Sequence, residues 1–180
     1  MIDEKEFIQQ LLDPKTQNIA FQKLLSEYQK PLYSHIRNIV LNHDDTDDVL
    51  QNTFVKVHQY LKNFKGESKL FSWMYRIATN EALTFLNQKA KLNGITSEAL
   101  QNKAIDNLKA DVYFDGDEIQ IKLQKAIITL PEKQQLVFKM KYFQELKYEE
   151  IAEILGTSVG ALKASYHHAV KKIEIYVTSN

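Results

Sequence analysis

Aromatic and basic side chains are mixed in the segment "FKGESKLFSWMYRIATNEAL", residues 64–83. Bases stack on aromatic rings while cations follow the phosphate backbone, so this mixture is typical of a surface that binds single-stranded nucleic acid. Phe71 and Tyr75 lie four residues apart, which is the spacing of core residues on an amphipathic helix. Phe64 precedes that helix, and it is the ring that we expect to contact a base.

The stretch "FKGESKL" also supplies what a pocket for an unstacked base requires. Pulling a base out of the stack costs free energy that stacking and hydrogen bonds in the pocket must return. Gly66 allows a close approach of the backbone, and Lys65 and Lys69 can hold the flanking phosphates. Asn80 carries an amide that donates and accepts hydrogen bonds, as reading a base edge requires. A solvent-facing helix residue is the alternative interpretation of Asn80.

A second candidate site lies in "EEIAEILGTSVGALKASYHHAVKK", residues 149–172. Ala152 is small enough for two helices to cross closely, Gly156 suits a helix end with positive φ, and Leu162 returns to the core. Ser158 is expected to cap the second helix. The pattern predicts a helix-turn-helix, with a plain helical hairpin as the alternative.

The second helix of this motif would present polar and small residues to DNA, while a solvated face is the alternative. Lysines suit phosphates and histidines suit base edges. The outward residues are Gly160, Lys163, Ala164, His167, His168, Lys171 and Lys172.

The sequence argues against an enzyme and against a metal site. It contains no Cys, which excludes a disulfide framework, a thiolate metal site and a cysteine nucleophile. The five His are scattered, whereas a catalytic site needs convergent nucleophiles, bases or metal ligands. The run "DDTDD", residues 44–48, indicates a helix start with four Asp in the first turn, where the helix dipole favours anions. We expect no catalytic residue, no metal ligand and no cofactor.

Helices must position both candidate sites. Apolar residues recur every three or four positions, and alternating strand patterns are hard to find, so we predict an all-α protein. The helix at about Asn18–Leu41 is expected to be interrupted near Pro31, and Ser68 is expected to cap the helix that follows it. The other expected helices are Glu4–Leu12, the one that "DDTDD" opens, Glu118–Thr129, Pro131–Phe143, Tyr148–Leu155 and Val159–Tyr176.

Between the two helical blocks the pattern thins and the charge changes sign. The formal net charge is zero, yet Asn93 to Gln120 carries two Lys against six acidic residues, and the chain from Ile121 onward carries nine Lys against six Glu. We predict two small helical domains, residues 1–92 and 120–180, joined by a flexible acidic linker, residues 93–119. A partner would set their relative placement. Because few cations are available, DNA binding by the free protein is expected to be weak and salt-sensitive.

The first residues, "MIDEKEFIQQLL", are acidic where a signal peptide needs a basic segment. No apolar run approaches the roughly 20 residues that span a bilayer. We expect a soluble cytoplasmic protein without stable membrane insertion.

Taken together, the two blocks resemble the extracytoplasmic-function (ECF) sigma factors of bacteria. Residues 47–86, "DDVLQNTFVKVHQYLKNFKGESKLFSWMYRIATNEALTFL", are similar to the second conserved region of that family. Residues 123–173, with "LP" at a helix start and "SVGALK" at the turn, are similar to the fourth region. The resemblance covers about Asn18–Ile173. It implies a protein that binds core RNA polymerase, recognises −35 and −10 promoter elements and directs transcription initiation.

The resemblance also implies which residues make these contacts. It places Asp48, Gln51, Asn52 and Val55 against the β′ clamp of core RNA polymerase. It places Phe64, Lys65, Gly66, Lys69, Leu70, Arg76 and Asn80 at the −10 element, and Lys163, Ala164, His167, His168, Lys171 and Lys172 at the −35 element. Family members usually carry arginines where this chain has Ser165, His168 and Val170, which implies weaker or different −35 contacts. An anti-sigma factor is a further implied partner.

A stand-alone helix-turn-helix regulator is the alternative function, with an N-terminal domain that senses a ligand or dimerises. Such a regulator would bind a palindromic site without polymerase. The segment at residues 64–83 argues against it, because a sensor domain does not need that mixture of aromatic and basic residues.

Overall fold

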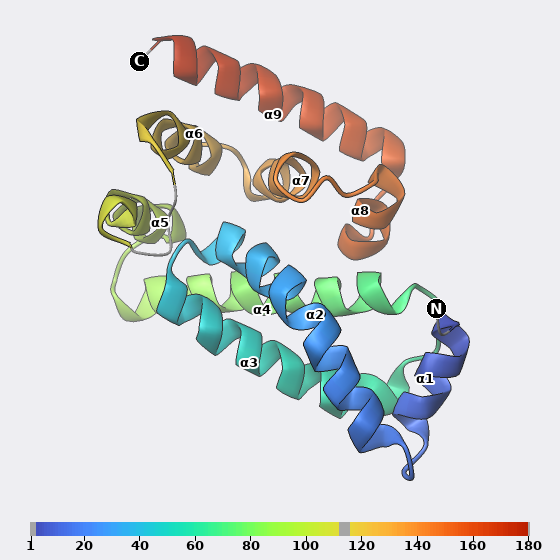
Figure 1. The fold of residues 1–180 in the computed structure, drawn as a ribbon. Helices are drawn as coiled ribbons and strands as arrows, with labels where there is room; N and C mark the ends of the chain where they lie inside the picture. The colour runs from blue at the N-terminus through green and yellow to red at the C-terminus, as the bar shows by residue number, and fades with distance from the viewer. Residues whose placement is uncertain (1–2, 112–115, 180) are drawn as a thin grey trace.

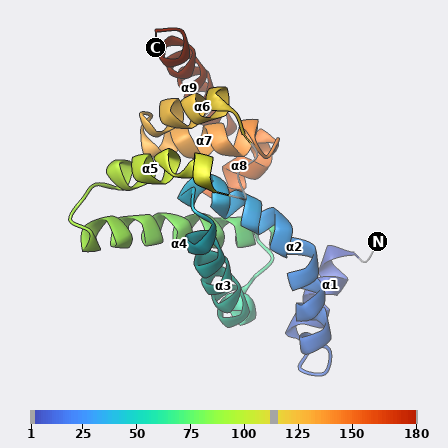
Figure 2. The same cartoon turned by 60° about the vertical axis from the view of Figure 1, so that its left-hand side comes forward.

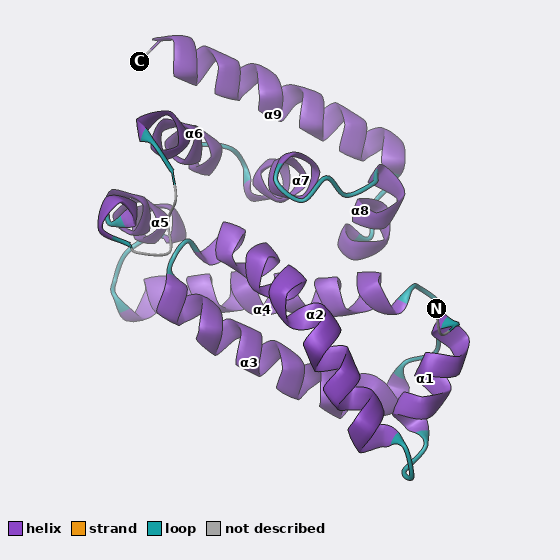
Figure 3. Ribbon diagram, viewed as in Figure 1, coloured by secondary structure: helices purple, strands orange, loops and turns teal. Residues whose placement is uncertain are grey.

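The computed structural model describes residues 3–111 and 116–179, and within these ranges every regular element is helical (Figure 3). The all-α prediction is confirmed. Figure 1 shows two layers, with α1–α4 in one and α6–α9 in the other. The elements are α1 (Glu4–Leu12), α2 (Gln17–Val40), α3 (His43–Tyr60), the 3₁₀ turn η1 (Leu61–Asn63), α4 (Leu70–Leu92), α5 (Ser97–Asp106), the 3₁₀ turn η2 (Leu108–Ala110), α6 (Glu118–Ile128), α7 (Glu132–Tyr142), α8 (Tyr148–Leu155) and α9 (Val159–Ser179).

Helix α2 is continuous, so the predicted interruption near Pro31 was wrong. A proline inside a helix leaves the carbonyl four residues earlier without its donor. Pro31 and Glu27 are both exposed, so water can hydrate that carbonyl. Leu24 and Leu32, on either side, are fully buried, and their packing holds the helix together through the proline.

Helix α4 begins at Leu70, one residue later than a Ser68 cap requires, and that prediction was also wrong. Its N-cap is Lys69, which makes no side-chain cap hydrogen bond. Instead, the backbone N–H of Leu70 donates to the Glu4 carboxylate of α1 at 3.1 Å. A residue far away in the sequence therefore satisfies the helix start and favours it electrostatically.

The C-terminal helices follow the predicted boundaries closely. Helix α8 ends at Gly156 with φ of 63°, and the Ser158 hydroxyl accepts from the backbone N–H of Ala161 at 3.2 Å, as expected. Leu162 is fully buried, which confirms its place in the core. Ile127, Phe138 and Ala169 form part of a core that α6, α7 and α9 share.

The acidic linker contains a helix that sequence analysis did not predict. Helix α5 is capped by Thr96, whose hydroxyl accepts from the N–H of Ala99 at 3.1 Å. Gln101, Ile105 and Leu108 are buried at helical spacing, and Gln101 Nε2 donates to the backbone oxygen of Ile39. Figure 2 shows α5 between the two layers, in agreement with its contacts to α4 and α6.

The two layers share a hydrophobic core in this structure. Ile36 of α2 and Tyr75 of α4 pack in one cluster with Val137 and Met140 of α7 and Ile154 of α8. We call the residues of α1–α4 the N-terminal half and those of α6–α9 the C-terminal half. Their packing is a closed arrangement, which the sequence pattern did not predict because the contacts lie more than 40 residues apart.

Candidate polymerase and promoter interfaces

Helix α3 presents the predicted polymerase-binding residues on its outer surface. Asp48, Gln51, Asn52 and Val55 are all exposed, Val55 at 49% of its surface. Gln51 and Val55 also line a groove of about 730 Å³ between α2 and α3. Apolar and polar side chains both line the groove, and its other lining residues are Phe21, Leu25, Gln29, Asp47, Leu50, Phe54, His58 and Gln59.

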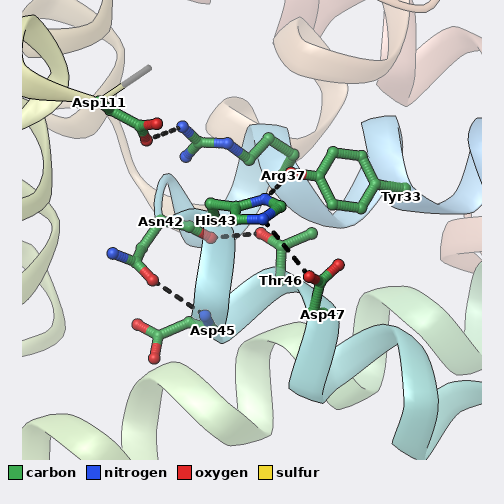
Figure 4. Close-up of polar contacts among 8 residues, drawn as sticks. All are labelled: Tyr33, Arg37, Asn42, His43, Asp45, Thr46, Asp47 and Asp111. Carbon is green, nitrogen blue, oxygen red and sulfur yellow. Dashed lines mark hydrogen bonds and ion pairs between the residues drawn. The ribbon is translucent and has the colours of Figure 1, made fainter. Parts of the chain in front are cut away.

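Polar contacts fix the start of α3 (Figure 4). Asn42 caps the helix, because its Oδ1 accepts from the backbone N–H of Asp45 at 2.9 Å. Lys89 of α4 reaches both carboxylate oxygens of Asp45 at 2.6 Å. His43 lies between Tyr33, 2.6 Å from its Nδ1, and Asp47, 3.5 Å from its Nε2.

The helix begins at His43, so only Asp44 and Asp45 lie in its first turn, not all four aspartates as predicted. Asp48 lies one turn further along, where its exposed carboxylate faces solvent. Arg37 of α2 forms an ion pair with Asp111 at the end of the linker, visible at the edge of the same cluster in Figure 4. The ion pair thereby attaches the linker to the C-terminal end of α2.

The loop between η1 and α4 surrounds a second pocket. This pocket has a volume of about 420 Å³. Gly66 has φ of 70°, and no heavy atom lies within 4 Å of the position that a Cβ would take. The backbone conformation, rather than crowding, therefore requires glycine there. The pocket is lined by Asn63, Phe64, Lys65, Glu67, Ser68, Trp73 and Arg76.

Two predicted −10 residues are buried instead of exposed. Phe64 is 9% exposed and packs against Trp73 with ring centroids 4.9 Å apart. Leu70 is 1% exposed and belongs to the same core cluster as Leu11 of α1. The Phe64 ring lines the pocket but is buried among apolar residues of α1 and η1, so its contact with a base stays a prediction.

Trp73 lines this pocket, although sequence analysis did not single it out as a contact residue. It is only partly buried, and it lies three residues before Arg76, so both side chains share one face of α4. The i, i+3 spacing of an aromatic and a basic residue was the signal that could have identified it. Asn63, at the end of η1, is the other lining residue that was missed.

The remaining predicted −10 residues are exposed. Lys65, Gly66 and Lys69 lie in the loop, while Arg76 and Asn80 lie one turn apart on the outer face of α4. A guanidinium N–H of Arg76 donates to the backbone oxygen of Glu153 in α8. The closed arrangement therefore places α8 against one of the cations at this surface.

The second helix of the helix-turn-helix exposes every predicted −35 residue. Lys163, Ala164, His167, His168, Lys171 and Lys172 are all exposed on α9. Gly160 is exposed on the same helix and has open space at its Cβ position. Lys163 Nζ lies 5.8 Å from the ring centre of Tyr148, and Lys172 Nζ lies 3.3 Å from Gln134 Oε1.

Two further features bear on what the molecule can do. Within residues 3–111 and 116–179, no helix is both long and apolar enough to cross a membrane. Over the same residues, no three His, Asp or Glu side chains gather in a way that would hold a metal ion.

Comparisons with known proteins agree with this division into two parts. The family model for Sigma-70 region 2 matches residues 24–92, and that for Sigma-70, region 4 matches residues 120–173. The ECF RNA polymerase sigma-E factor of Haemophilus influenzae is 29% identical over 163 residues, which cover 86% of both chains. RNA polymerase sigma factor SigV of Bacillus subtilis is 27% identical over 154 residues, covering 86% of this chain and 89% of its own.

Solved structures show the same fold. CnrH, in complex with the cytosolic domain of CnrY, has a TM-score of 0.71 at 17% identity and covers 98% of both chains. The sigma factor RpoE, in complex with the anti-sigma factor NepR from Bartonella quintana, has a TM-score of 0.64 at 17% identity and covers 88% of this chain and 96% of its own. With both conserved regions matched in order and ECF relatives aligned over most of its length, this chain belongs to the ECF sigma factors.

Proposed function

We propose that this ECF sigma factor divides its contacts among three surfaces. The groove between α2 and α3 binds the β′ clamp of core RNA polymerase. The loop at residues 64–70 and the outer face of α4 bind the −10 element, and α9 binds the −35 element. The observation that carries the proposal is the pocket beside Gly66, where Trp73 and two cationic side chains, Lys65 and Arg76, surround an open volume.

The groove on α3 has the composition of a protein interface. Interfaces combine a desolvated apolar centre with a polar rim. Leu50, Phe54 and Val55 supply apolar surface, while Gln51 and the acidic start of α3 supply polar groups. Asp48 and Asn52 lie just outside the groove, where they can extend the polar rim.

The pocket beside Gly66 can accept an unstacked base. Its volume of about 420 Å³ accommodates a nucleobase, and Trp73 offers a ring for stacking. Lys65 and Lys69 stand on the loop for phosphates, and Asn80 offers an amide to a base edge further along α4. The mostly buried Phe64 ring lines one side of this pocket.

The closed arrangement must open on a promoter. Elements at −35 and −10 are separated by about 25 base pairs, or roughly 85 Å of duplex at 3.4 Å per pair. A compact chain of 180 residues has a radius of gyration of about 16 Å, so it cannot reach both elements. We propose that residues 1–92 and 120–180 separate as two domains and that residues 93–119 bridge them.

The chain acts without catalytic groups of its own, as an initiation factor that works in the cytoplasm with polymerase. An anti-sigma factor is its proposed regulator, in analogy with the RpoE–NepR complex. A protein wrapped around both halves would hold the closed arrangement.

A transcription assay tests the assignment of the three surfaces. The assay compares wild-type protein with a variant in which an unrelated loop replaces residues 65–70. Each protein is mixed with core polymerase and with promoters randomised at each −10 position. We expect the exchange to change the preferred −10 base and to leave polymerase affinity and −35 preference unchanged. An unchanged −10 preference would show that the loop is only a connection.

The matched control is a change on the other DNA surface. Lys171→Ala removes one exposed cation of α9 and should weaken binding to all −35 sequences. The number of phosphate contacts, obtained from the slope of log K against log salt concentration, should fall by about one. It should not affect the −10 preference.

A further inference from the structure

The contact between the two halves contains buried basic side chains. Lys139 of α7 is 2% exposed and lines a small cavity of about 150 Å³ with residues of α2, α4 and α5. His35 of α2 is fully buried. Its Nδ1 lies 3.1 Å from Gln144 Oε1 in the loop before α8, and its Nε2 lies 2.8 Å from Thr79 Oγ1 of α4. Both side chains are therefore almost entirely removed from bulk water where the halves pack together.

Lys139 lacks a compensating partner in the part of the chain that the structure describes. No carboxylate forms an ion pair with its Nζ there, and no hydrogen bond to Nζ is found. Glu98 and Glu132 line the same cavity, but both are exposed. Gln144 Nε2 is also buried without an acceptor. A buried cation without a partner opposes the packing that buries it.

The groups that face these two side chains are few. Around His35 they are Tyr75, whose ring centre lies 4.8 Å away, Thr79, Gln144 and Lys139. Burial raises the pKa of Tyr75 to about 12, so this phenol stays neutral in the range considered below. Around Lys139 the charged groups are His35, Glu98 and Glu132.

We propose that His35 and Lys139 form a proton-sensitive latch, in which protonation of these buried groups drives the N-terminal and C-terminal halves apart. When the halves separate, water reaches both side chains and hydrates the charged forms. When they close, the uncharged forms are favoured. Opening therefore takes up protons, and the closed arrangement weakens as the pH falls.

The direction and size of the effect follow from the two groups. Burial lowers the pKa of His35 from 6.5 to about 4; the hydrogen bond to Gln144 opposes this shift, and the charge of Lys139 adds to it. Burial lowers the pKa of Lys139 from 10.5 to about 8. By linkage, Lys139 should reduce the ratio of closed to open molecules about twentyfold between pH 9.5 and 7.5. His35 should reduce it about tenfold between pH 7.5 and 5.5.

Energy transfer between two dyes measures this ratio in the free full-length chain. Because the chain contains no Cys, Lys62→Cys and Glu174→Cys introduce the only thiols, on exposed sites of the two halves. We expect transfer to fall as the pH is lowered from 9.5 to 5.5. Lys139→Met should remove the change above pH 7.5, and His35→Gln should remove the change below it.

Matched controls distinguish the titration of His35 and Lys139 from the titration of exposed His and Lys side chains. Lys133→Met on the exposed part of α7 and His168→Gln on α9 should retain the wild-type pH dependence. Far-ultraviolet circular dichroism verifies that each variant is folded. Constant transfer across the range, or the same pH dependence in wild type and Lys139→Met, would overturn the proposal. The assay contains no polymerase or DNA, so its outcome is independent of the surfaces assigned above.

Discussion

Phe64 and Trp73 have different roles at the candidate −10 pocket, although they are neighbours in space. Phe64 faces the core formed with Leu61 and Leu70, whereas Trp73 is partly exposed at the opening. A rigid wall beneath the pocket lets the exposed ring stack on a base without reordering the loop. The two rings should therefore respond differently to truncation.

Truncation of the buried ring should destabilise the protein. Phe64→Ala removes a packed aromatic side chain and leaves a cavity, so we expect the free energy of unfolding to fall by about 3 kcal/mol. The control Lys65→Ala changes an exposed neighbour and should alter it by less than about 0.5 kcal/mol. Urea denaturation followed by circular dichroism provides the measurement. Similar midpoints for both variants would contradict the burial of Phe64.

Residue exposure was predictable where polar chemistry and helical spacing agreed. Asn80 and His167 are exposed as expected, because polar groups lie outside the apolar stripe of an amphipathic helix, and Lys65 is exposed in the loop before α4. The burial of Phe64 and Leu70 was not predicted, because their core cluster is completed by Phe7 and Leu11 of α1, more than 50 residues earlier. Local sequence contains no signal for such a contact.

At the scale of single helices, α1 completes the start of α4. The Glu4 carboxylate accepts a hydrogen bond from the Leu70 N–H, which lacks a partner within its own helix. The N-terminal helix therefore contributes to the shape of the −10 loop without contacting the pocket.

Removal of this carboxylate should weaken the start of α4. Glu4→Ala is expected to cost about 1 kcal/mol, the usual contribution of a helix cap, and to increase amide hydrogen exchange at Leu70. Glu6→Ala, on the same helix, is the control, since Glu6 is exposed and its carboxylate accepts a hydrogen bond from Gln10 of the same helix. Equal exchange at Leu70 in the two variants would show that the cap is not formed in solution.

Helix α5 depends on one apolar side chain more than on its own propensity. Ile105 is fully buried against Leu41, Leu108 and Ile128. Ile105→Ala should lower the free energy of unfolding by about 2 kcal/mol or more. Local unfolding of α5 should then allow trypsin to cleave after the neighbouring Lys103. Cleavage after Lys103, followed by mass spectrometry, should be faster than in wild type. Lys103→Arg is the control and should keep the slow rate, and rapid cleavage of both proteins would mean that α5 is not packed.

Most helices were predictable because their signals are local, whereas α5 was not. The end of α8 combines a glycine with a serine cap, and both have the expected geometry. In α5 the first buried position is Gln101, a polar residue that satisfies the backbone oxygen of Ile39. A buried amide interrupts the apolar pattern, so the segment resembled a solvated linker.

At the scale of the whole molecule, the closed arrangement combines a shared core with polar groups that oppose it. Val137, Met140 and Ile154 pack against the N-terminal half, which favours closure. Lys139 sits in the same contact as a buried cation, which favours opening. A protein that is proposed to open on a promoter benefits from such a balance, because a small change in free energy shifts it.

Replacement of the buried amine tests this balance through stability. Lys139→Met keeps roughly the length of the side chain and removes its charge. We therefore expect the free energy of unfolding, measured by urea denaturation, to rise by roughly 1–3 kcal/mol at pH 7. Lys133→Met, on the exposed surface of α7, should change it by less than about 0.5 kcal/mol. Because burial lowers the pKa of Lys139 from 10.5 to about 8, the cost of burying this group is absent above pH 10.5 and grows as the pH falls toward 8. The advantage of Lys139→Met over wild type should therefore be smaller at pH 10 than at pH 7. A variant that is less stable than wild type at both pH values would show that Lys139 stabilises the closed arrangement instead of opposing it.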